Sequence, residues 1–327
     1  MKQRRLGADG PMVGAVALGC MSFGGAYGAT DMAESHRTLA RALDLGVTHL
    51  DTARIYGNGV SEEVIGAFIR DHPGRFTIAT KGGIVTTPKR GFDNSPAYLR
   101  ECVETSLKRL GVEHVELYYV HRRDQTIPIE DVMETLLRFR EEGKIGGIGF
   151  SEIAPASIER AAAVGPVMAV QSEYSLWTRL PELGAIDACK RVGAAFVPFS
   201  PVGRGVFGDT PVDISTFGER DFRIGNPRFT EPNFSRNMER IAAIRAFAAE
   251  RGWKLASLAI AWTLHRGDHL IPIPGTRSPG HLEELAAGAE ITLAAEDMAA
   301  IERILPAGFA HGPRYGEAQR IGPEDYC

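Results

Sequence analysis

The fold is decided by one stretch, residues 115–151, which reads VELYYVHRRDQTIPIEDVMETLLRFREEGKIGGIGFS. Residues 115–121 are rich in β-branched and aromatic side chains and predict a strand. Apolar residues then recur at helical spacing over residues 129–142, and residues 145–151 predict a second strand. Two strands joined by a helix lie parallel, because a parallel pair needs a long crossover connection. The stretch therefore predicts a βαβ unit.

The same alternation continues in both directions from this unit. Further strands are expected at residues 15–19, 48–52, 76–81, 167–171, 194–200 and 270–274. Further helices are expected at residues 31–46, 61–70, 95–111, 156–164, 183–192, 236–251, 255–265, 281–287 and 296–305. Eight strands that alternate with helices in 327 residues have the size of a closed barrel.

We therefore expect an α/β fold, a (β/α)8 TIM barrel that fills one domain over residues 1–327. Residues 4–6 and 12–13, around Asp9-Gly10, predict an N-terminal hairpin, and extra helices are expected toward the C-terminus. An open doubly wound sheet is the alternative. It lacks support, because no GxGxxG turn follows a strand.

The composition restricts the partners. The formal net charge is −4 and no basic block stands out, which argues against nucleic acid and anionic membranes as partners. No apolar run approaches the ~20 residues of a membrane span, and the N-terminus lacks the apolar run of a secretory signal. The four cysteines, Cys20, Cys102, Cys189 and Cys327, lie far apart without a CxxC pair. This pattern favours reduced thiols in the cytoplasm and no metal site. The sequence leaves the oligomeric state open, and a homo-oligomer is possible.

Polar residues end six of the expected strands: Asp51, Lys81, His121, Ser151, Gln171 and Ser200. A strand end becomes polar in many proteins simply because the chain leaves the core, so one such residue carries little information. In a closed barrel, however, these ends converge on one rim, where the active sites of such barrels lie. Six polar ends on one rim predict a functional site.

Four residues near these ends suggest acid–base chemistry. A phenol has an ordinary pKa of ~10, which is high for an acid that works near neutrality. The ammonium of Lys81 favours the phenolate of Tyr56, and Asp51 keeps that ammonium charged. His121 can donate a hydrogen bond to a carbonyl oxygen. An Asp–Lys contact alone is weak evidence, because structural ion pairs are common.

The motifs around these residues resemble the aldo-keto reductases. The resemblance rests on Leu50-Asp51-Thr52-Ala53-Arg54-Ile55-Tyr56-Gly57, on Ala79-Thr80-Lys81-Gly82-Gly83, on Tyr119-Val120-His121-Arg122-Arg123-Asp124, and on Gly143-Lys144-Ile145 with Gly149-Phe150-Ser151. It covers nearly the whole chain, from about residue 5 to residue 304. It implies an NADPH-dependent oxidoreductase that reduces an aldehyde or ketone to an alcohol. Tyr56 would be the proton donor, Lys81 and Asp51 would tune it, and His121 would orient the carbonyl.

Three further segments, residues 18–21, 171–179 and 199–205, are similar in sequence to one branch of this family. That branch includes pyridoxal reductases and alkaloid-aldehyde reductases. In that branch the Ser-Asn pair of the wider family is often Ser-Glu, as in Ser151-Glu152 here. The change removes an asparagine that would contact the nicotinamide amide, and leaves Ser151 and Gln171 to hold it.

The resemblance also implies a cofactor site for NADPH (NADP⁺ in its oxidised form). Phe199 would stack on the nicotinamide, residues 200–205 would wrap the pyrophosphate, and Thr276 and Arg277 would bind the 2′-phosphate. The full set is Gly19, Met21, Asp51, Ser151, Gln171, Phe199, Ser200, Pro201, Val202, Gly203, Arg204, Gly205, Pro274, Gly275, Thr276, Arg277, His281 and Glu284. His281 and Leu285 depart from the Arg and Asn of many relatives, which indicates a looser grip on the adenosine.

Variable loops would contact a small carbonyl substrate, through Phe23, Tyr27, Tyr56, His121 and Trp177 and through the long segment 203–233. Two other functions are kept as alternatives. A barrel aldolase or isomerase would use Lys81 as a Schiff-base nucleophile, although Asp51 and Tyr56 argue against it. A cofactor-sensing module without turnover would keep the same four residues. The sequence does not identify the carbonyl compound or the direction favoured in the cell.

Overall fold

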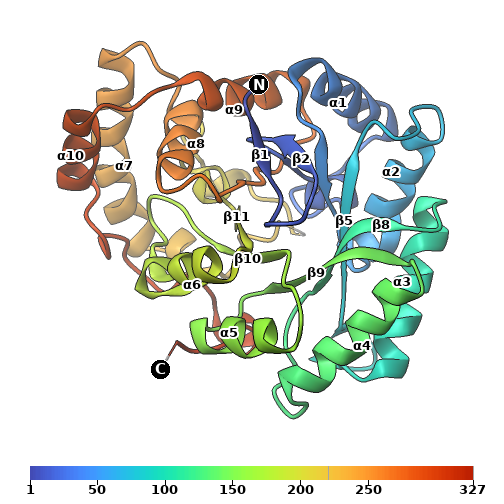
Figure 1. Cartoon of the computed structure of the whole chain (residues 1–327). Coiled ribbons are helices and arrows are strands. Elements are labelled where there is room, and N and C mark those ends of the chain that lie inside the picture. Colours follow the sequence, from blue (N-terminus) through green and yellow to red (C-terminus); the bar gives the residue numbers. More distant parts are fainter. Residues whose placement is uncertain (220, 327) are drawn as a thin grey trace.

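A parallel sheet curled into a barrel forms the centre of the molecule in the computed structural model, which describes residues 1–219 and 221–326 (Figure 1). Seven strands pair in the order β11-β10-β9-β8-β5-β4-β3, and each pair is parallel. They are β3 (Leu18–Gly19), β4 (His49–Asp51), β5 (Thr77–Gly82), β8 (Val115–Val120), β9 (Ile145–Ser151), β10 (Ala169–Glu173) and β11 (Ala195–Phe199). The predicted (β/α)8 class is confirmed.

Residues 270–275, which include the eighth strand predicted at residues 270–274, close the barrel. Isolated parallel bridges join this segment to β11 on one side and to β3 on the other. The amides of Ile271 and Ile273 donate to carbonyls of the β11 strand, both at 2.9 Å. Pro272 and Pro274 have no N–H, so toward β3 they only accept, at 3.0 Å each. The missing donors explain why the segment forms bridges rather than a continuous strand.

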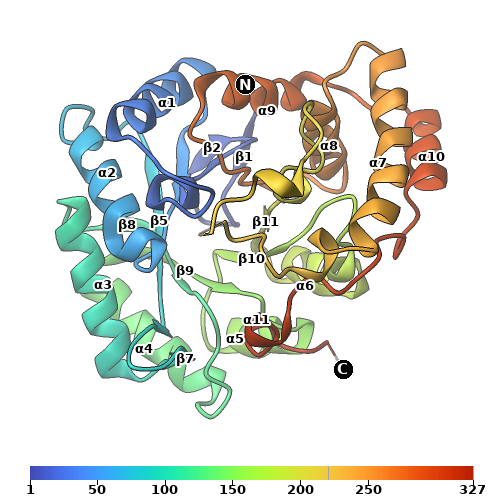
Figure 2. The same cartoon turned by 180° about the vertical axis from the view of Figure 1, so that it is seen from behind.

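Helices surround the barrel in both views (Figures 1 and 2). Those of the ring are α1 (Met32–Leu45), α2 (Val60–Ile69), α3 (Pro96–Leu110), α4 (Ile129–Glu141), α5 (Pro155–Val164), α6 (Ala185–Val192), α8 (Leu255–His265) and α9 (Pro279–Ala287). The extra helices α7 (Asn233–Glu250) and α10 (Ala295–Ile304) pack together at the outer edge, and the short α11 (Glu317–Arg320) lies near the C-terminus. The predicted extra helices are therefore present.

The predicted N-terminal hairpin is also confirmed. β1 (Gln3–Arg5) pairs antiparallel with β2 (Met12–Gly14), and the two cross the end of the barrel that faces the viewer in Figure 1. Leu6 and Val13 are fully buried and pack with the residues inside the barrel. The hairpin thus closes this end with apolar side chains, and leaves the other end, seen in Figure 2, to the loops that follow the strands.

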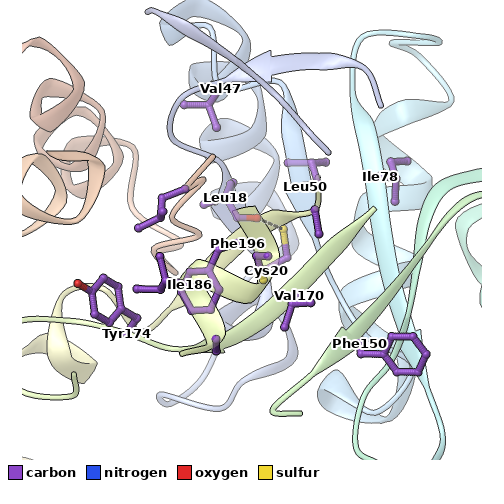
Figure 3. Packing of buried hydrophobic residues seen from close by; sticks show 14 of the residues in the cluster. Leu18, Cys20, Val47, Leu50, Ile78, Phe150, Val170, Tyr174, Ile186 and Phe196 are labelled. Carbon is purple, nitrogen blue, oxygen red and sulfur yellow. Dashed lines mark hydrogen bonds between the residues drawn. The ribbon is translucent and has the colours of Figure 1, made fainter. Parts of the chain in front are cut away.

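Alternation along the strands produces two apolar layers. On β8, Leu117 and Tyr119 face the barrel interior, while Tyr118 and Val120 face the surrounding helices. Figure 3 shows part of the outer layer, in which Phe196 packs near residues from several neighbouring strands. Because the period is two, the inward positions at the carboxyl ends of the strands carry the polar residues of the predicted site.

Some element boundaries differ from the prediction. The first strand, expected at residues 15–19, shortens to β3, because the amide of Ala15 donates to Lys2 of the hairpin at 2.8 Å. Asp31 and Glu34 have the spacing of a capping box at the start of α1, but only half of it forms. Asp31 accepts from the amide of Ala33 at 3.0 Å, whereas Glu34 faces Arg277 instead. A hairpin of β6 (Ile84–Val85) and β7 (Gly91–Phe92), which follows β5, was not predicted.

Among the helices that the structure describes, none has the length and apolar content needed to cross a bilayer. Cys20, Cys102 and Cys189 are buried free thiols, and Cys327 lies outside the described residues. Burial raises the pKa of the Cys20 and Cys189 thiols far above the ordinary range.

Candidate active site

The predicted site residues meet at the open end of the barrel. Register pairs Lys81 on β5 with Tyr119 on β8, and Ser151 on β9 with Gln171 on β10. His121 directly follows β8, and its amide donates to Gly82 at 2.8 Å. The strands therefore deliver to one rim the polar ends that sequence reasoning placed there.

Lys81 and Asp51 form a buried ion pair. The ammonium donates to Asp51 and to the carbonyl of Thr52, the latter at 2.7 Å, and Lys81 has no exposed surface. Burial acts to lower the pKa of Lys81, but Asp51 and Tyr56 together outweigh it and the net pKa is raised. The lysine is therefore charged at neutral pH.

Tyr56 lies beside this pair, in the loop after β4. The ammonium of Lys81 is 5.1 Å from the centre of the Tyr56 ring. Burial raises the pKa of the phenol above its ordinary value, and Lys81 opposes that rise. The influence of Lys81 has the predicted direction, although burial is the larger effect. The phenol is thus protonated at neutral pH, as a proton donor must be.

His121 completes the group of four. Its ring lies edge-on to that of Tyr56, with centroids 5.8 Å apart and planes at 84°. Burial lowers its pKa well below the ordinary value, and the charges of Arg122, Lys81 and Arg90 add to this effect. Nδ1 is buried and has no hydrogen-bond partner among the described residues. The imidazole is therefore neutral and can donate one hydrogen bond without adding charge.

The two residues expected to hold a nicotinamide amide lie next to the four. Gln171 donates from Nε2 to the free oxygen of Asp51, Oδ2, at 2.8 Å. The hydroxyl of Ser151 accepts from Nη1 of Arg122 at 2.9 Å. Phe199, at the end of β11, is half-buried and packs on the apolar interior of the barrel. All three thus lie at the carboxyl ends of neighbouring strands.

A tight loop follows β11 at the position predicted for the pyrophosphate. Ser200, Gly203, Arg204 and Gly205 all have left-handed backbone angles, with φ of 51°, 59°, 60° and 102°. Such a succession bends the chain sharply and is typical of loops that present amides to an anion. Arg223 lies against this loop, and a Cβ at Gly205 would come within 3.4 Å of its Nη1 atom.

A pocket opens between the loop after β3 and part of the long segment that follows β11. It has a volume of about 410 Å³ and is lined by Tyr27, Gly28, Thr216, Gly218, Glu219, Asp221 and Arg223. Arg277 borders the same region, because Nη1 donates to the carbonyl of Gly28 at 3.3 Å. Ligand pockets commonly have volumes of ~300–1,000 Å³. The pocket volume lies within this range, and Arg277 is next to the pocket.

Arg277 has an acidic neighbour at the predicted 2′-phosphate site. Its Nε atom lies 3.8 Å from Oε2 of Glu34 on α1. Thr276 is buried and accepts from the amide of Ser278 at 3.0 Å, while His281 is exposed at the start of α9. An internal carboxylate thus stands where a phosphate would be expected to bind.

Sequence reasoning missed a cluster of buried charges next to the four residues, here called the glutamate–arginine cluster (Glu152, Glu173, Arg204 and Arg314). Arg314 donates to both carboxylate oxygens of Glu152, and Arg204 donates to Glu173 at 2.9 Å. Glu152 also accepts from the amide of Glu173 at 2.8 Å. The side chain of Arg204 therefore points to Glu173, so only its backbone is left to serve the pyrophosphate loop.

Two residues predicted to contact substrate lie in the interior. Phe23 is fully buried, and Trp177 packs edge-on against Phe207 and Phe229 with centroids 6.1 and 5.6 Å away. Arg228 of the long segment covers the same indole and donates to the carbonyl of Trp177 at 2.8 Å. Tyr27, Tyr56 and His121 remain near the openings.

Comparison with known proteins agrees with this geometry. The sequence model of the protein family described as "Aldo/keto reductase family" matches residues 15–306 of this chain. "Probable aldo-keto reductase 1" of Glycine max is 36% identical over 315 residues, which cover 95% of this chain and 91% of the relative. The NADP(+) aldo-keto reductase yakc of Schizosaccharomyces pombe is 37% identical over 320 residues, which cover 95% and 94%.

Solved structures agree as well. The glycerol dehydrogenase AKR11B4 from Gluconobacter oxydans superimposes with a TM-score of 0.84 at 29% identity, covering 93% of this chain and 94% of its own. The aldo-keto reductase AKR11C1 from Bacillus halodurans, in its holo form, gives a TM-score of 0.77 at 25% identity, covering 97% and 99%. The chain belongs to the aldo/keto reductase family.

Proposed function

We propose that this chain reduces an aldehyde or ketone to an alcohol with NADPH, and that Tyr56 is the proton donor. The observation that carries the proposal is the buried Lys81–Asp51 pair beside the Tyr56 ring, with the neutral His121 edge-on to the same ring. Family membership supports an oxidoreductase that uses a nicotinamide cofactor, and one relative carries NADP(+) in its name.

Each residue has a distinct task in this proposal. A bound dihydronicotinamide would supply the hydride. His121 donates a hydrogen bond to the carbonyl oxygen and orients it. Tyr56 gives its proton to that oxygen as negative charge develops there. Lys81 then stabilises the phenolate that remains, and Asp51, held by Gln171, keeps the ammonium in place.

The residues at the barrel mouth fit the proposed cofactor. Ser151 and Gln171 carry polar groups toward the opening, Phe199 offers a half-buried ring, and residues 200–205 form the left-handed loop. Arg277, which bonds to Gly28 at the edge of the pocket, supplies a guanidinium suited to the 2′-phosphate. His281 and Glu284 would lie beside the adenosine.

The lysine nucleophile that the sequence left open has less support. A Schiff base forms from a neutral amine, whereas the pKa of Lys81 is raised and its ammonium is held by Asp51. Asp51 and Tyr56 together favour the reductase.

The test is NADPH oxidation, followed at 340 nm, across a panel of aldehydes and ketones with pyridoxal included, each compared with NADH. We expect turnover of at least one small aldehyde, with NADPH the better cofactor. A folded protein that binds NADPH but reduces no carbonyl compound would support the cofactor-sensing alternative instead.

A further inference from the structure

A second, smaller pocket lies at the barrel mouth beside His121. It is a small cavity of about 40 Å³, partly open to solvent, and is lined by Arg90, Phe92, Arg122, Phe222, Tyr315, Gln319 and Gly322. These residues come from the loops after β5, β8 and β11 and from the C-terminal segment, whose helix α11 is seen with β7 in Figure 2. The pocket therefore assembles from four separate parts of the chain.

Two of the lining side chains are guanidinium groups without a carboxylate partner. Among the residues that the structure describes, no Asp or Glu oxygen lies within 4.0 Å of Arg90 or Arg122 in an ion pair. Partial burial and the positive charge of Arg122 lower the pKa of Arg90. Glu152 and Glu173, whose charges act on Tyr315 of the lining, are already held by Arg314 and Arg204.

Arg122 is held in a position from which it can bind a ligand. Both hydrogen bonds that it donates within the described chain come from Nη1, to the carbonyl of His121 at 2.6 Å and to Ser151 at 2.9 Å. Its remaining N–H groups are left for another acceptor. Gly322 of the C-terminal segment packs on its stem, since a Cβ there would come within 3.1 Å of Cδ.

The other groups that line the pocket indicate what kind of ligand would accompany an anion bound by the two guanidinium groups. Tyr315 is buried, and burial raises its pKa to about 12, so its hydroxyl can donate a hydrogen bond. Phe92 and Phe222 add apolar surface beside the two guanidinium groups. Because Arg122 directly follows His121, the pocket adjoins the place where the carbonyl would react.

We propose that the natural substrate is a carbonyl compound with an anionic group, a carboxylate or a phosphate, attached to an apolar or aromatic body, and that Arg90 and Arg122 bind the anion. Guanidinium groups suit both anions, because their planar forks of donors match two oxygens at once. This inference rests on the proposed carbonyl reductase function and names its substrate class.

The test compares substrates that differ mainly in charge. We measure kcat/KM with NADPH for 4-carboxybenzaldehyde and for the neutral 4-nitrobenzaldehyde, and in a second arm for pyridoxal 5′-phosphate and pyridoxal. In Arg90→Met, the preference for the anionic member should fall by about 10- to 150-fold, the range of a charge-assisted hydrogen bond. The arm with the larger fall identifies the anion. Raised salt should weaken the preference in the wild type, because screening acts on exposed charges.

Lys89→Met is the matched control. Lys89 is an exposed residue next to Arg90 that does not line the pocket, so its loss removes the same charge from the same hairpin. The preference should stay at the wild-type value in this variant. An unchanged preference in Arg90→Met, or an equal fall in Lys89→Met, overturns the proposal.

A binding measurement separates this inference from the proposed function. Calorimetric titration of the full chain with 4-(hydroxymethyl)benzoate, and with 4-nitrobenzyl alcohol as the neutral control, needs no turnover. Absence of NADPH oxidation with every aldehyde would remove the proposed function, while binding of the benzoate that Arg90→Met weakens would still support the anion pocket. Equal binding of both alcohols by the wild type would contradict it.

Discussion

Two groups of buried charges lie at the mouth of the barrel, and they are built differently. In the first, the catalytic group (Asp51, Tyr56, Lys81 and His121), one ammonium is held by one carboxylate beside a phenol and a neutral imidazole. In the second, the glutamate–arginine cluster, Arg314 and Arg204 fully engage two carboxylates that are at most 4% exposed.

The two groups of charges differ in whether their polar atoms are free to bind a substrate. Burial lowers the pKa of the His121 imidazole, which keeps it neutral, and burial keeps the Tyr56 phenol protonated. Such groups can form new hydrogen bonds with a substrate. In the cluster the donors and acceptors satisfy one another, and Arg314 brings the C-terminal segment to β9 and β10 through Glu152 and Glu173. We infer that the catalytic group serves the reaction and that the cluster holds the loops around it.

The largest effect is expected from Tyr56→Phe. Only one oxygen is lost, so the variant should fold and bind NADPH nearly as the wild type does. Carbonyl reduction should fall by roughly 100- to 10,000-fold, the usual contribution of a positioned general acid. Single-turnover reduction and thermal unfolding should be measured on the same samples. Lys81→Met should be similarly damaging, and Asp51→Asn milder.

Substantial reduction by a folded Tyr56→Phe protein would contradict the assignment of the acid. Tyr98→Phe is a matched control, because this change removes a tyrosine hydroxyl that bonds to Arg54 and Ile84, away from the catalytic group. Its reduction rate should remain close to that of the wild type.

In the cluster the expected loss is in stability. Arg314→Met leaves the buried carboxylate of Glu152 without its partner and should lower the free energy of unfolding by about 3–5 kcal/mol, the cost of breaking a buried pair from one side. Urea unfolding measures this loss. Arg303→Met, an exposed arginine on α10, is the control and should change stability by less than about 0.5 kcal/mol. Equal losses of unfolding free energy in both variants would contradict the inferred role of the cluster in stability.

Cofactor choice depends on a third charge contact. Arg277→Ala should weaken NADPH binding by about 10- to 150-fold and spare NADH, because a charge-assisted phosphate contact contributes roughly 1.5–3 kcal/mol. Equilibrium titration of both cofactors decides this. The structure adds Glu34→Gln as a companion: removal of the carboxylate 3.8 Å from Arg277 should tighten NADPH binding. Equal affinity of the native protein for both cofactors would contradict the assignment.

The catalytic group could be predicted from sequence because its signals are local. Asp51, Lys81 and His121 lie at or directly after strand ends, where a closed barrel brings polar residues together. The barrel itself followed from the alternation of strands and helices. Even the irregular eighth strand was placed correctly, although its two prolines prevent a continuous ladder.

The glutamate–arginine cluster and the anion pocket could not be predicted in the same way. Arg314 and Tyr315 lie after the last long helix, in a segment with no periodic pattern. Glu152, the partner of Arg314, is 162 residues away in the chain, and no local rule joins residues at such a separation. The left-handed φ of 60° at Glu152 is likewise fixed by tertiary contacts rather than by its residue type. The only sign of the cluster in the sequence was the presence of charged residues that no local pattern explains.

The smallest effect concerns pH, and it distinguishes the two groups of charges by the range in which each loses stability. Burial acts to raise the pKa of Glu173, but Arg204, Arg314 and Arg228 outweigh it, and the net pKa is lowered. Its contribution is therefore full above the ordinary glutamate pKa of ~4.3 and is lost as the pH falls through the lower folded value.

His121 acts at higher pH. Its folded pKa lies well below the ordinary ~6.5, so the unfolded chain takes up the proton first as the pH falls. Stability is therefore full above about pH 6.5 and declines below it, because the unfolded chain binds a proton that folded His121 does not. Urea unfolding at pH 7.5 and 5.0 should show a smaller decline in His121→Gln than in the wild type. His49, whose pKa burial lowers to about 4, contributes to the decline in both proteins. Glu173→Gln should decline as the wild type does, because Glu173 titrates in neither state over this range. An equal decline in the wild type and His121→Gln would show that His121 is not held neutral by the fold.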